Sequence, residues 1–132
     1  MLTIKEAKNL RSKKLNKIEK IKELKNPMDV YNKLKDISQG DWEDLSKEDL
    51  TFFLKCFGIF EKKNNFMIRI RISGGKLNAI QARVIGEVAR EFGDDYIDLT
   101  TRMQIEIRNI KLKDLFNVIK KLESVGLTSF QT

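Results

Sequence analysis

Four arginines in two short stretches of the chain have the spacing that binding of an anion would require. Arg69 and Arg71 lie two residues apart, and Arg102 and Arg108 lie six residues apart. Because successive side chains of a strand point to opposite faces, an even spacing places all four on one face if both stretches are strands. A guanidinium stays charged and binds carboxylates or phosphates through two parallel hydrogen bonds.

Both stretches alternate between apolar and polar residues. Residues 66–72 read Phe-Met-Ile-Arg-Ile-Arg-Ile, and residues 96–110 continue a similar alternation that is interrupted at Thr101. The apolar set of the second stretch is Ile97, Leu99, Met103, Ile105 and Ile107. We predict two strands side by side in one sheet, with one buried apolar face and with the arginines on the other face beside Asp98 and Glu106.

Three interpretations of this polar face compete. The arginines pair with Asp98, Glu106 and water on an ordinary solvated face, where such pairs are individually weak. Alternatively the face binds single-stranded nucleic acid, but such sheets stack bases on exposed aromatics and the polar positions of these two stretches have none. In the third, the face binds a compact anion, and Gly74-Gly75 lets a planar group approach the backbone closely. The residue types favour the first and third interpretations equally.

Composition excludes several other classes of chemistry. The 132 residues fit one domain, and residues 1–40 carry eleven Lys/Arg and five acids within a net charge of +7, which indicates a solvated basic face or an acidic partner. The chain has no histidine, which removes the usual base of a catalytic triad and the HExxH zinc motif. Its one thiol, Cys56, cannot hold an iron–sulfur cluster alone and is interpreted as a buried small apolar residue. With no apolar run of ~20 residues and no signal sequence, we predict a soluble cytoplasmic protein with no membrane partner.

The remaining sequence predicts mostly helices. Apolar periodicity and capping residues predict helices over 3–25, from Pro27 through Ile37, over Leu50–Phe57, from Asn78 to Gly93, and over Leu112–Ser124. From residue 66 the order is therefore strand, helix, strand, helix, with one more short strand near Ile59. A two-stranded sheet is marginal alone, so we expect the rest of the sheet to be missing or to come from another chain.

Several segments together resemble the nitrite/sulfite reductase family. Residues 66–75 resemble its "FMLRxRxPGG" strand, residues 98–108 its "DxTTRQNxQxR" strand, and residues 122–131 its "LexVGLtslQ" segment. Residues 16–19 and 25–30 are similar to the N-terminal lead of ferredoxin-dependent members. The similarity covers nearly the whole chain.

The resemblance implies a fold and an activity. The fold class is α+β, with a ferredoxin-like half-domain (βαβα) over residues 59–132 that follows an α-helical N-terminal extension over residues 1–58. The family reduces nitrite to ammonia, or sulfite to sulfide, by six electrons. Its cofactors are sirohaem, which carries eight carboxylates, and a [4Fe–4S] cluster that a cysteine bridges to the sirohaem. The assimilatory members take electrons from ferredoxin.

The resemblance also implies roles for particular residues. Arg69 matches the arginine on the substrate side of the sirohaem and is the expected catalytic residue. The expected cofactor-binding residues are Arg71, Thr100, Arg102, Gln104 and Arg108. No metal ligand is expected in this chain.

The chain departs from the family pattern at several positions. Ser73 replaces a usual Pro, and Glu106 stands where Gln is usual and would repel sirohaem carboxylates. Met103-Gln104 stands for the usual Gln-Asn, and Asn109 for a Gly or an aromatic residue. The family's cluster cysteines have no equivalent here, so we expect an N-terminal fragment of a sirohaem-dependent nitrite reductase with ferredoxin as donor, inactive alone, that needs a complementing C-terminal half. The resemblance of the N-terminal lead to ferredoxin-dependent nitrite reductases favours nitrite over sulfite as the substrate. The alternatives are a sulfite reductase half-domain and a stand-alone anion-binding module without catalysis.

Overall fold

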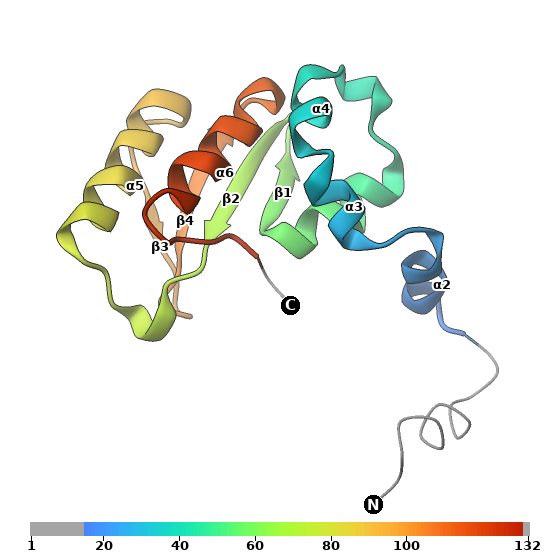
Figure 1. The fold of residues 1–132 in the computed structure, drawn as a ribbon, viewed down its shortest axis with the longest axis horizontal. Helices are drawn as coiled ribbons and strands as arrows, with labels where there is room; N and C mark the ends of the chain where they lie inside the picture. Colours follow the sequence, from blue (N-terminus) through green and yellow to red (C-terminus); the bar gives the residue numbers. More distant parts are fainter. Residues whose placement is uncertain (1–14, 131–132) are drawn as a thin grey trace, which may run out of the picture.

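The computed structural model describes residues 15–130. Helices and strands both contribute, as the α+β prediction requires (Figure 1). Of the predicted helix over 3–25, residues 3–14 lie outside the described range, and the described part is helical only over α2, which begins after its N-cap Asn16. The α-helices are α2 (Lys17–Leu24), α3 (Pro27–Asn32), α4 (Leu34–Gln39), α5 (Ala79–Phe92) and α6 (Leu115–Glu123).

Four strands form one antiparallel sheet. They are β1 (Ile59–Lys62), β2 (Asn65–Ile70), β3 (Asp98–Leu99) and β4 (Ile105–Ile110), in the order β1-β2-β4-β3. The prediction of a short strand near Ile59 is confirmed. The expectation that the rest of the sheet is missing was wrong, because the chain itself supplies four strands.

The second predicted strand, over residues 96–110, is a hairpin. The chain reverses between Thr100 and Gln104, where the Thr100 N–H donates to the Gln104 carbonyl at 2.9 Å and Met103 has a positive φ of 58°. Ile97, Leu99 and Met103 were expected in the core, but the turn leaves them 39%, 78% and 65% exposed. The alternating pattern runs through the turn because the segment contains neither Gly nor Pro.

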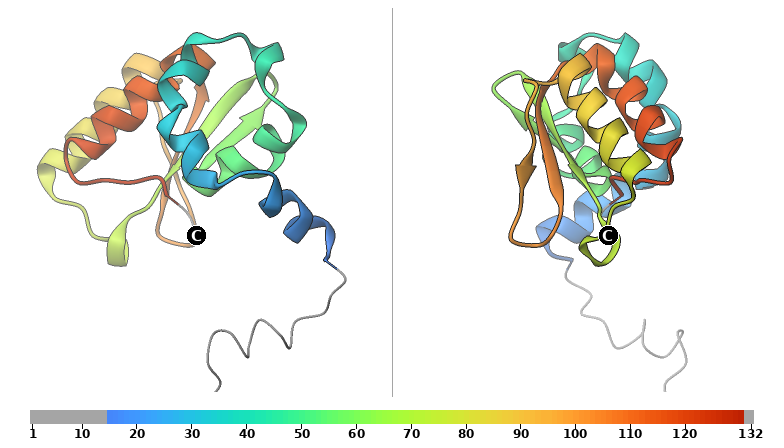
Figure 2. Two further views of the ribbon diagram at one scale, coloured as in Figure 1. Left: turned by 45° about the vertical axis from the view of Figure 1, so that its right-hand side comes forward. Right: turned by 90° about the vertical axis from the view of Figure 1, so that its left-hand side faces the viewer.

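The core lies between the sheet and the helices. Figure 2 shows α5 and α6 on one face of the sheet and no helix on the opposite face of the β2–β4 pair. Facing residues of the two central strands, such as Ile68 with Ile107 and Phe66 with Ile110, are fully buried. Between these two pairs β4 has one residue more than β2, which makes a β-bulge. Asn109 lies in this bulge with a φ of 58°, a conformation that Asn tolerates better than most residues.

The helical lead before β1 joins the same core. The single helix predicted from Pro27 is broken into α3 and α4 at Lys33, while its predicted cap is confirmed by a 3.0 Å bond from Met28 N–H to Asn26 Oδ1. Next come a 3-10 turn (η1, Trp42–Asp44), a π-helical turn (η2, Asp49–Phe53) and a 3-10 turn (η3, Leu54–Phe57). Phe53 and Leu54 bring these turns into the core.

The Cys56 thiol lies at the edge of that core. It is half-buried and donates to the Phe52 carbonyl at 3.6 Å. Burial raises the pKa of Cys56 above its ordinary value. This supports its interpretation as a packing residue rather than a reactive thiolate.

Of the two helices that cover the sheet, α5 begins and ends where the sequence predicted, while α6 begins at Leu115, three residues later than predicted, because Leu112–Asp114 form a 3-10 turn. Asn78 and Gln81 cap α5 reciprocally, at 2.8 and 3.2 Å, and Gly93 ends it. A Cβ at Gly93 would lie 2.8 Å from Ile107 Cγ2, so this helix end fits against β4 only as glycine. Short 3-10 turns precede the helices, η4 (Ser73–Gly75) before α5 and η5 (Leu112–Asp114) before α6. Within residues 15–130, every helix is too short or too polar to cross a membrane.

Candidate anion-binding site

The polar face of the central strands carries an alternating set of arginines and carboxylates. Arg69 on β2 faces Glu106 on β4, and Asp98 on β3 faces the same Glu106. Arg108 follows two residues after Glu106 on β4. Directly opposed positions of antiparallel strands bring side chains of one face into contact. We call these four residues the inner end of the arginine face.

Every charge of the inner end has an internal partner. Arg69 Nε donates to Glu106 Oε1 at 2.8 Å, and Arg69 Nη2 lies 2.7 Å from the same oxygen. The other carboxylate oxygen of Glu106 lies 3.4 Å from Arg108 Nη2, and Arg108 Nε donates to Asp98. The hydrogen bond to Asp98, with the attraction of that carboxylate, raises the pKa of Arg108. The predicted pairing of arginines with Asp98 and Glu106 is therefore confirmed for Arg69 and Arg108.

An aromatic ring that sequence reasoning missed also belongs to this face. Phe60 on β1 faces Met67 on β2, which places both on the polar face, and the Arg69 guanidinium lies 4.9 Å from the Phe60 ring centroid. The statement that the polar side of the sheet has no aromatic was therefore wrong. The alternation in β1 could have indicated it, since Ile59 and Phe60 must point to opposite faces. The guanidinium covers the ring, so Phe60 and Glu106 both orient Arg69.

The other predicted residues gather where the strands end. Arg71 follows β2 and its N–H donates to the Thr128 carbonyl at 2.8 Å, while Arg102 lies in the hairpin turn between β3 and β4. We call Arg71, the turn of residues 100–104 and the turn of residues 73–75 the outer end. Both turns lie at the same end of the sheet (Figure 2). They touch, because a Cβ at Gly75 would lie 3.1 Å from Met103 Sδ.

The cations of the outer end differ from those of the inner end. The side chains of Arg71 and Arg102 are exposed, and among residues 15–130 neither has an ion pair or a side-chain hydrogen bond. Thr100 Oγ1 accepts from Gln104 N–H at 3.2 Å, which leaves its hydroxyl proton available to a ligand. Gln104 Oε1 is buried and has no hydrogen-bond partner in the described part of the chain. The outer end therefore combines uncompensated positive charge with unused polar groups.

Arg102 does not lie on a strand, as the sequence predicted, but in the turn. The structure thus brings the six expected site residues together as two groups, Arg69 with Arg108, and Arg71 with Thr100, Arg102 and Gln104. The first group is neutralised by two carboxylates of the chain. An anion would be attracted more strongly to the second group, because no carboxylate among the described residues pairs with Arg71 or Arg102.

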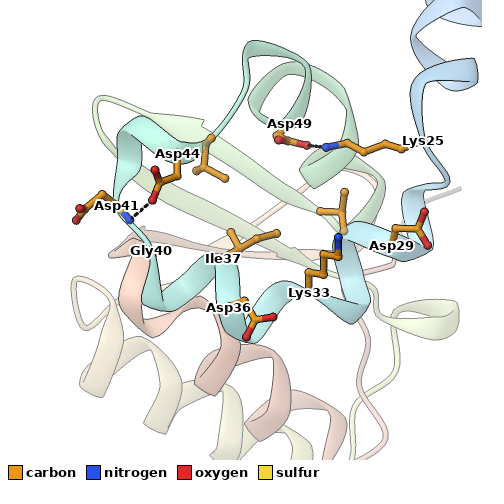
Figure 3. A pocket seen from close by; sticks show the side chains of 11 residues that line it. Lys25, Asp29, Lys33, Asp36, Ile37, Gly40, Asp41, Asp44 and Asp49 are labelled. Atoms are coloured by element: carbon orange, nitrogen blue, oxygen red, sulfur yellow. Dashed lines mark hydrogen bonds and ion pairs between the residues drawn. The ribbon is translucent and has the colours of Figure 1, made fainter.

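A hollow of about 320 Å³ is lined by residues of the helical lead and by none of the six expected site residues (Figure 3). Five aspartates line it, namely Asp29, Asp36, Asp41, Asp44 and Asp49. Lys25 forms an ion pair with Asp49 across it. Burial alone would raise the pKa of Asp49, but hydrogen bonds from Lys25 and Ser46 outweigh burial and lower it. These carboxylates would repel an anion, and in residues 15–130 no three His, Cys, Asp or Glu side chains are grouped to hold a metal ion.

Comparisons with known proteins agree with this geometry. The sequence profile described as Nitrite/Sulfite reductase ferredoxin-like half domain matches residues 60–125, which contain both groups of site residues. The chain is 36% identical to ferredoxin–nitrite reductase of Leptolyngbya laminosa over 122 residues, which cover 89% of this chain and 24% of that protein. It is 33% identical to the chloroplastic ferredoxin–nitrite reductase of Arabidopsis thaliana, covering 91% of this chain and 22% of that protein.

A solved structure shares the fold. The structure of the Mycobacterium tuberculosis NirA protein superposes with a TM-score of 0.80 at 25% identity, over 88% of this chain and 25% of that one. The four-stranded sheet with its covering helices is thus the arrangement found in that protein. The chain spans about a quarter of the length of the relatives it matches.

Proposed function

Because the chain belongs to the nitrite/sulfite reductase ferredoxin-like half-domain family, we propose that it supplies the anion-binding arginines of a sirohaem-dependent nitrite reductase. The observation that carries this proposal is the outer end, where Arg71 and Arg102 are exposed and have no internal counter-ion within the described residues. A surface cation without a partner is the group that a carboxylate-rich ligand would engage. Nitrite is favoured over sulfite because the two relatives above are named ferredoxin–nitrite reductases.

The donor set of the outer end fits a polycarboxylate. Arg71 and Arg102 would hold carboxylates of the sirohaem, and the Thr100 hydroxyl would donate a hydrogen bond to one of them. The unpartnered atom of Gln104 is Oε1, an acceptor, so Gln104 would join these contacts only through its Nε2–H groups. Arg108, which the resemblance implied as a further cofactor ligand, is instead paired with Asp98 and Glu106. Sirohaem, when bound, would supply the iron centre at which the substrate anion is reduced. Arg69 would hold that anion, because a fixed positive charge stabilises the charge that develops on oxygen.

This role requires a complementing part of the enzyme. Four thiolates hold a [4Fe–4S] cluster, and the 132-residue chain has one cysteine, Cys56. The proposed cluster ligands and the contact with a ferredoxin donor therefore belong to another segment. We propose residues 59–132 as the half-domain and residues 1–58 as its helical lead. Six-electron reduction of nitrite by the 132-residue chain alone would contradict this division of roles.

Sirohaem binding to the 132-residue chain tests the proposal directly. The wild-type chain is titrated with sirohaem and the absorption spectrum of the tetrapyrrole is followed. We expect a saturable spectral change whose dissociation constant rises at least about tenfold in the double variant Arg71→Gln/Arg102→Gln, since two charge-assisted contacts are lost. The matched control is Arg83→Gln/Arg90→Gln, which removes the same charge from exposed positions of α5.

Two results would overturn the proposal. One is the absence of any spectral change with the wild-type chain. The other is an equal loss of binding in both double variants, which would mean that net charge alone governs the titration. If sirohaem causes no change while citrate binds and the Arg71→Gln/Arg102→Gln variant loses that binding, the chain is a stand-alone anion-binding module.

A further inference from the structure

Within residues 15–130, Glu106 is the one carboxylate that contacts two arginines of the face. Its side chain is 9% exposed, and its two oxygens face Arg69 and Arg108 separately. Burial of a carboxylate is stabilising only when charged donors satisfy it, and here two guanidinium groups do so. The sequence marked Glu106 as a departure that would repel a polycarboxylate, and the geometry gives that departure a local purpose.

The pair with Glu106 occupies two of the five N–H donors of Arg69. Nε and Nη2 both point at Glu106 Oε1, at 2.8 and 2.7 Å, and the Phe60 ring lies against the guanidinium plane. An anion that approaches Arg69 must use the remaining N–H groups and must lie near the Glu106 charge. At the inner end, the Glu106 carboxylate therefore orients the Arg69 guanidinium and also competes with any added anion for it.

We propose that Glu106 is a specificity-determining residue of the site, an internal counter-ion that withholds Arg69 and Arg108 from polycarboxylates and leaves Arg71 and Arg102 to hold them. The inference deepens the proposed function and rests on it for the identity of the site. In this proposal the outer end binds polycarboxylates, and the inner end admits only small anions of low charge. A unit charge within ~10 Å of a bound anion, at the effective dielectric of a protein surface, changes a binding constant by about tenfold.

Removing the charge of Glu106 while keeping its shape tests this assignment. The 132-residue chain and its Glu106→Gln variant are titrated with citrate by isothermal titration calorimetry at an ionic strength of about 0.1 M. We expect citrate to bind the Glu106→Gln variant about tenfold more tightly than the wild-type chain. The matched control is Glu87→Gln, which makes the same change in net charge at an exposed position of α5. This control is expected to stay within about twofold of wild type, because charges beyond a Debye length of ~10 Å are screened.

The outcomes separate this inference from the proposed function. If Glu106→Gln binds citrate no more tightly than wild type while Arg71→Gln/Arg102→Gln weakens sirohaem binding, the counter-ion role is wrong and the proposed function stands. If Glu106→Gln tightens citrate binding but sirohaem gives no spectral change, the counter-ion role stands and the proposed function fails. Equal tightening by Glu87→Gln, or no citrate binding to either chain, overturns the counter-ion role.

A second measurement applies to the wild-type chain and does not depend on the stability of any variant. Arginine Nε–H resonances are followed by NMR during the citrate titration. We expect the signals of Arg71 and Arg102 to shift, while the Arg69 signal, held by Glu106, stays in place. A shift of the Arg69 signal that equals or exceeds the other two would overturn the proposal.

Discussion

The inner and outer ends of the arginine face contain the same residue type in opposite electrostatic states. At the inner end Arg69 and Arg108 share Glu106 and Asp98, and the group is neutral. At the outer end Arg71 and Arg102 have no such partner within residues 15–130. The number of arginines on a strand therefore does not measure the capacity of a face to bind anions. What decides that capacity is which carboxylates the neighbouring strands place opposite them.

The two ends also differ in how tightly the backbone around them is packed. Near the inner end Gly58 has a φ of 66°, and its carbonyl accepts from Arg69 N–H at 2.8 Å. At the outer end Gly74 has a φ of 61°, and no atom lies within 4 Å of the position its Cβ would take. The same substitution at these two glycines therefore separates packing from conformational strain.

The largest expected effect is that of Gly58→Ala on folding. A Cβ there would lie 2.4 Å from the Ser129 carbonyl oxygen and 2.7 Å from that of Arg69, and backbone atoms cannot rotate away as a flexible side chain can. We expect the free energy of unfolding, measured by urea denaturation, to fall by about 3 kcal/mol or more. Gly74→Ala places an alanine at a positive φ without a steric clash, so it should lower the free energy of unfolding by about 1 kcal/mol. Similar losses at the two positions would mean that the ends are equally packed.

The next effect compares an arginine from each end. Arg69→Ala leaves the buried Glu106 with only the longer contact to Arg108, so we expect a loss of about 2–3 kcal/mol in the free energy of unfolding. Arg102→Ala removes an exposed side chain without a partner and should change it by less than about 0.5 kcal/mol. Urea denaturation of both variants, at matched pH and salt, gives the comparison.

The double variant Arg69→Ala/Glu106→Ala checks the reason for that loss. If the unpaired carboxylate causes the loss, removing Glu106 as well should recover part of it, and the two substitutions should be non-additive. Additive losses would mean that Arg69 acts through its contact with Phe60 instead, and the inner end would no longer count as a charge cluster.

The sequence predicted those features of the site that depend on neighbouring residues of one segment, and it missed those that depend on contacts between segments. The alternation of residues 66–72 correctly predicted β2 and its buried face, because a buried face imposes period two on every residue of the strand. The same signal failed at residues 96–110, where apolar Met103 continued the pattern through a turn. Phe60 was missed because alternation within β1 shows only that Ile59 and Phe60 point to opposite faces, while the pairing of β1 with β2 decides that the face of Phe60 is the one with the arginines. For the same reason the sequence did not decide whether Arg69 forms an ion pair with Glu106, because that contact depends on the register between β2 and β4.

A smaller loss than that of Arg69→Ala is expected at an internal ion pair outside the arginine face. Lys25 pairs with Asp49 in the helical lead, and the Asp49 side chain, which is 12% exposed, also accepts from Ser46 Oγ at 2.8 Å. Burial would raise the pKa of Asp49, but the hydrogen bonds from Lys25 and Ser46 lower it overall. We expect Asp49→Asn to reduce the free energy of unfolding by about 1–2 kcal/mol at pH 7.

The lowered pKa fixes the pH dependence of that loss. A carboxyl whose folded pKa lies below its unfolded value of about 3.9 contributes stability above that pH and loses it as the pH falls through the folded pKa. The difference between wild type and Asp49→Asn in urea midpoints should therefore be largest from pH 5 to 7 and should shrink below about pH 4. A difference that stays constant down to pH 3 would show that the Asp49 contribution comes from hydrogen-bond geometry rather than charge. Citrate binding at pH 7 and an ionic strength of about 0.1 M should be unchanged in Asp49→Asn, because the Lys25 charge that it leaves uncompensated lies in the helical lead and is screened from the outer end of the arginine face.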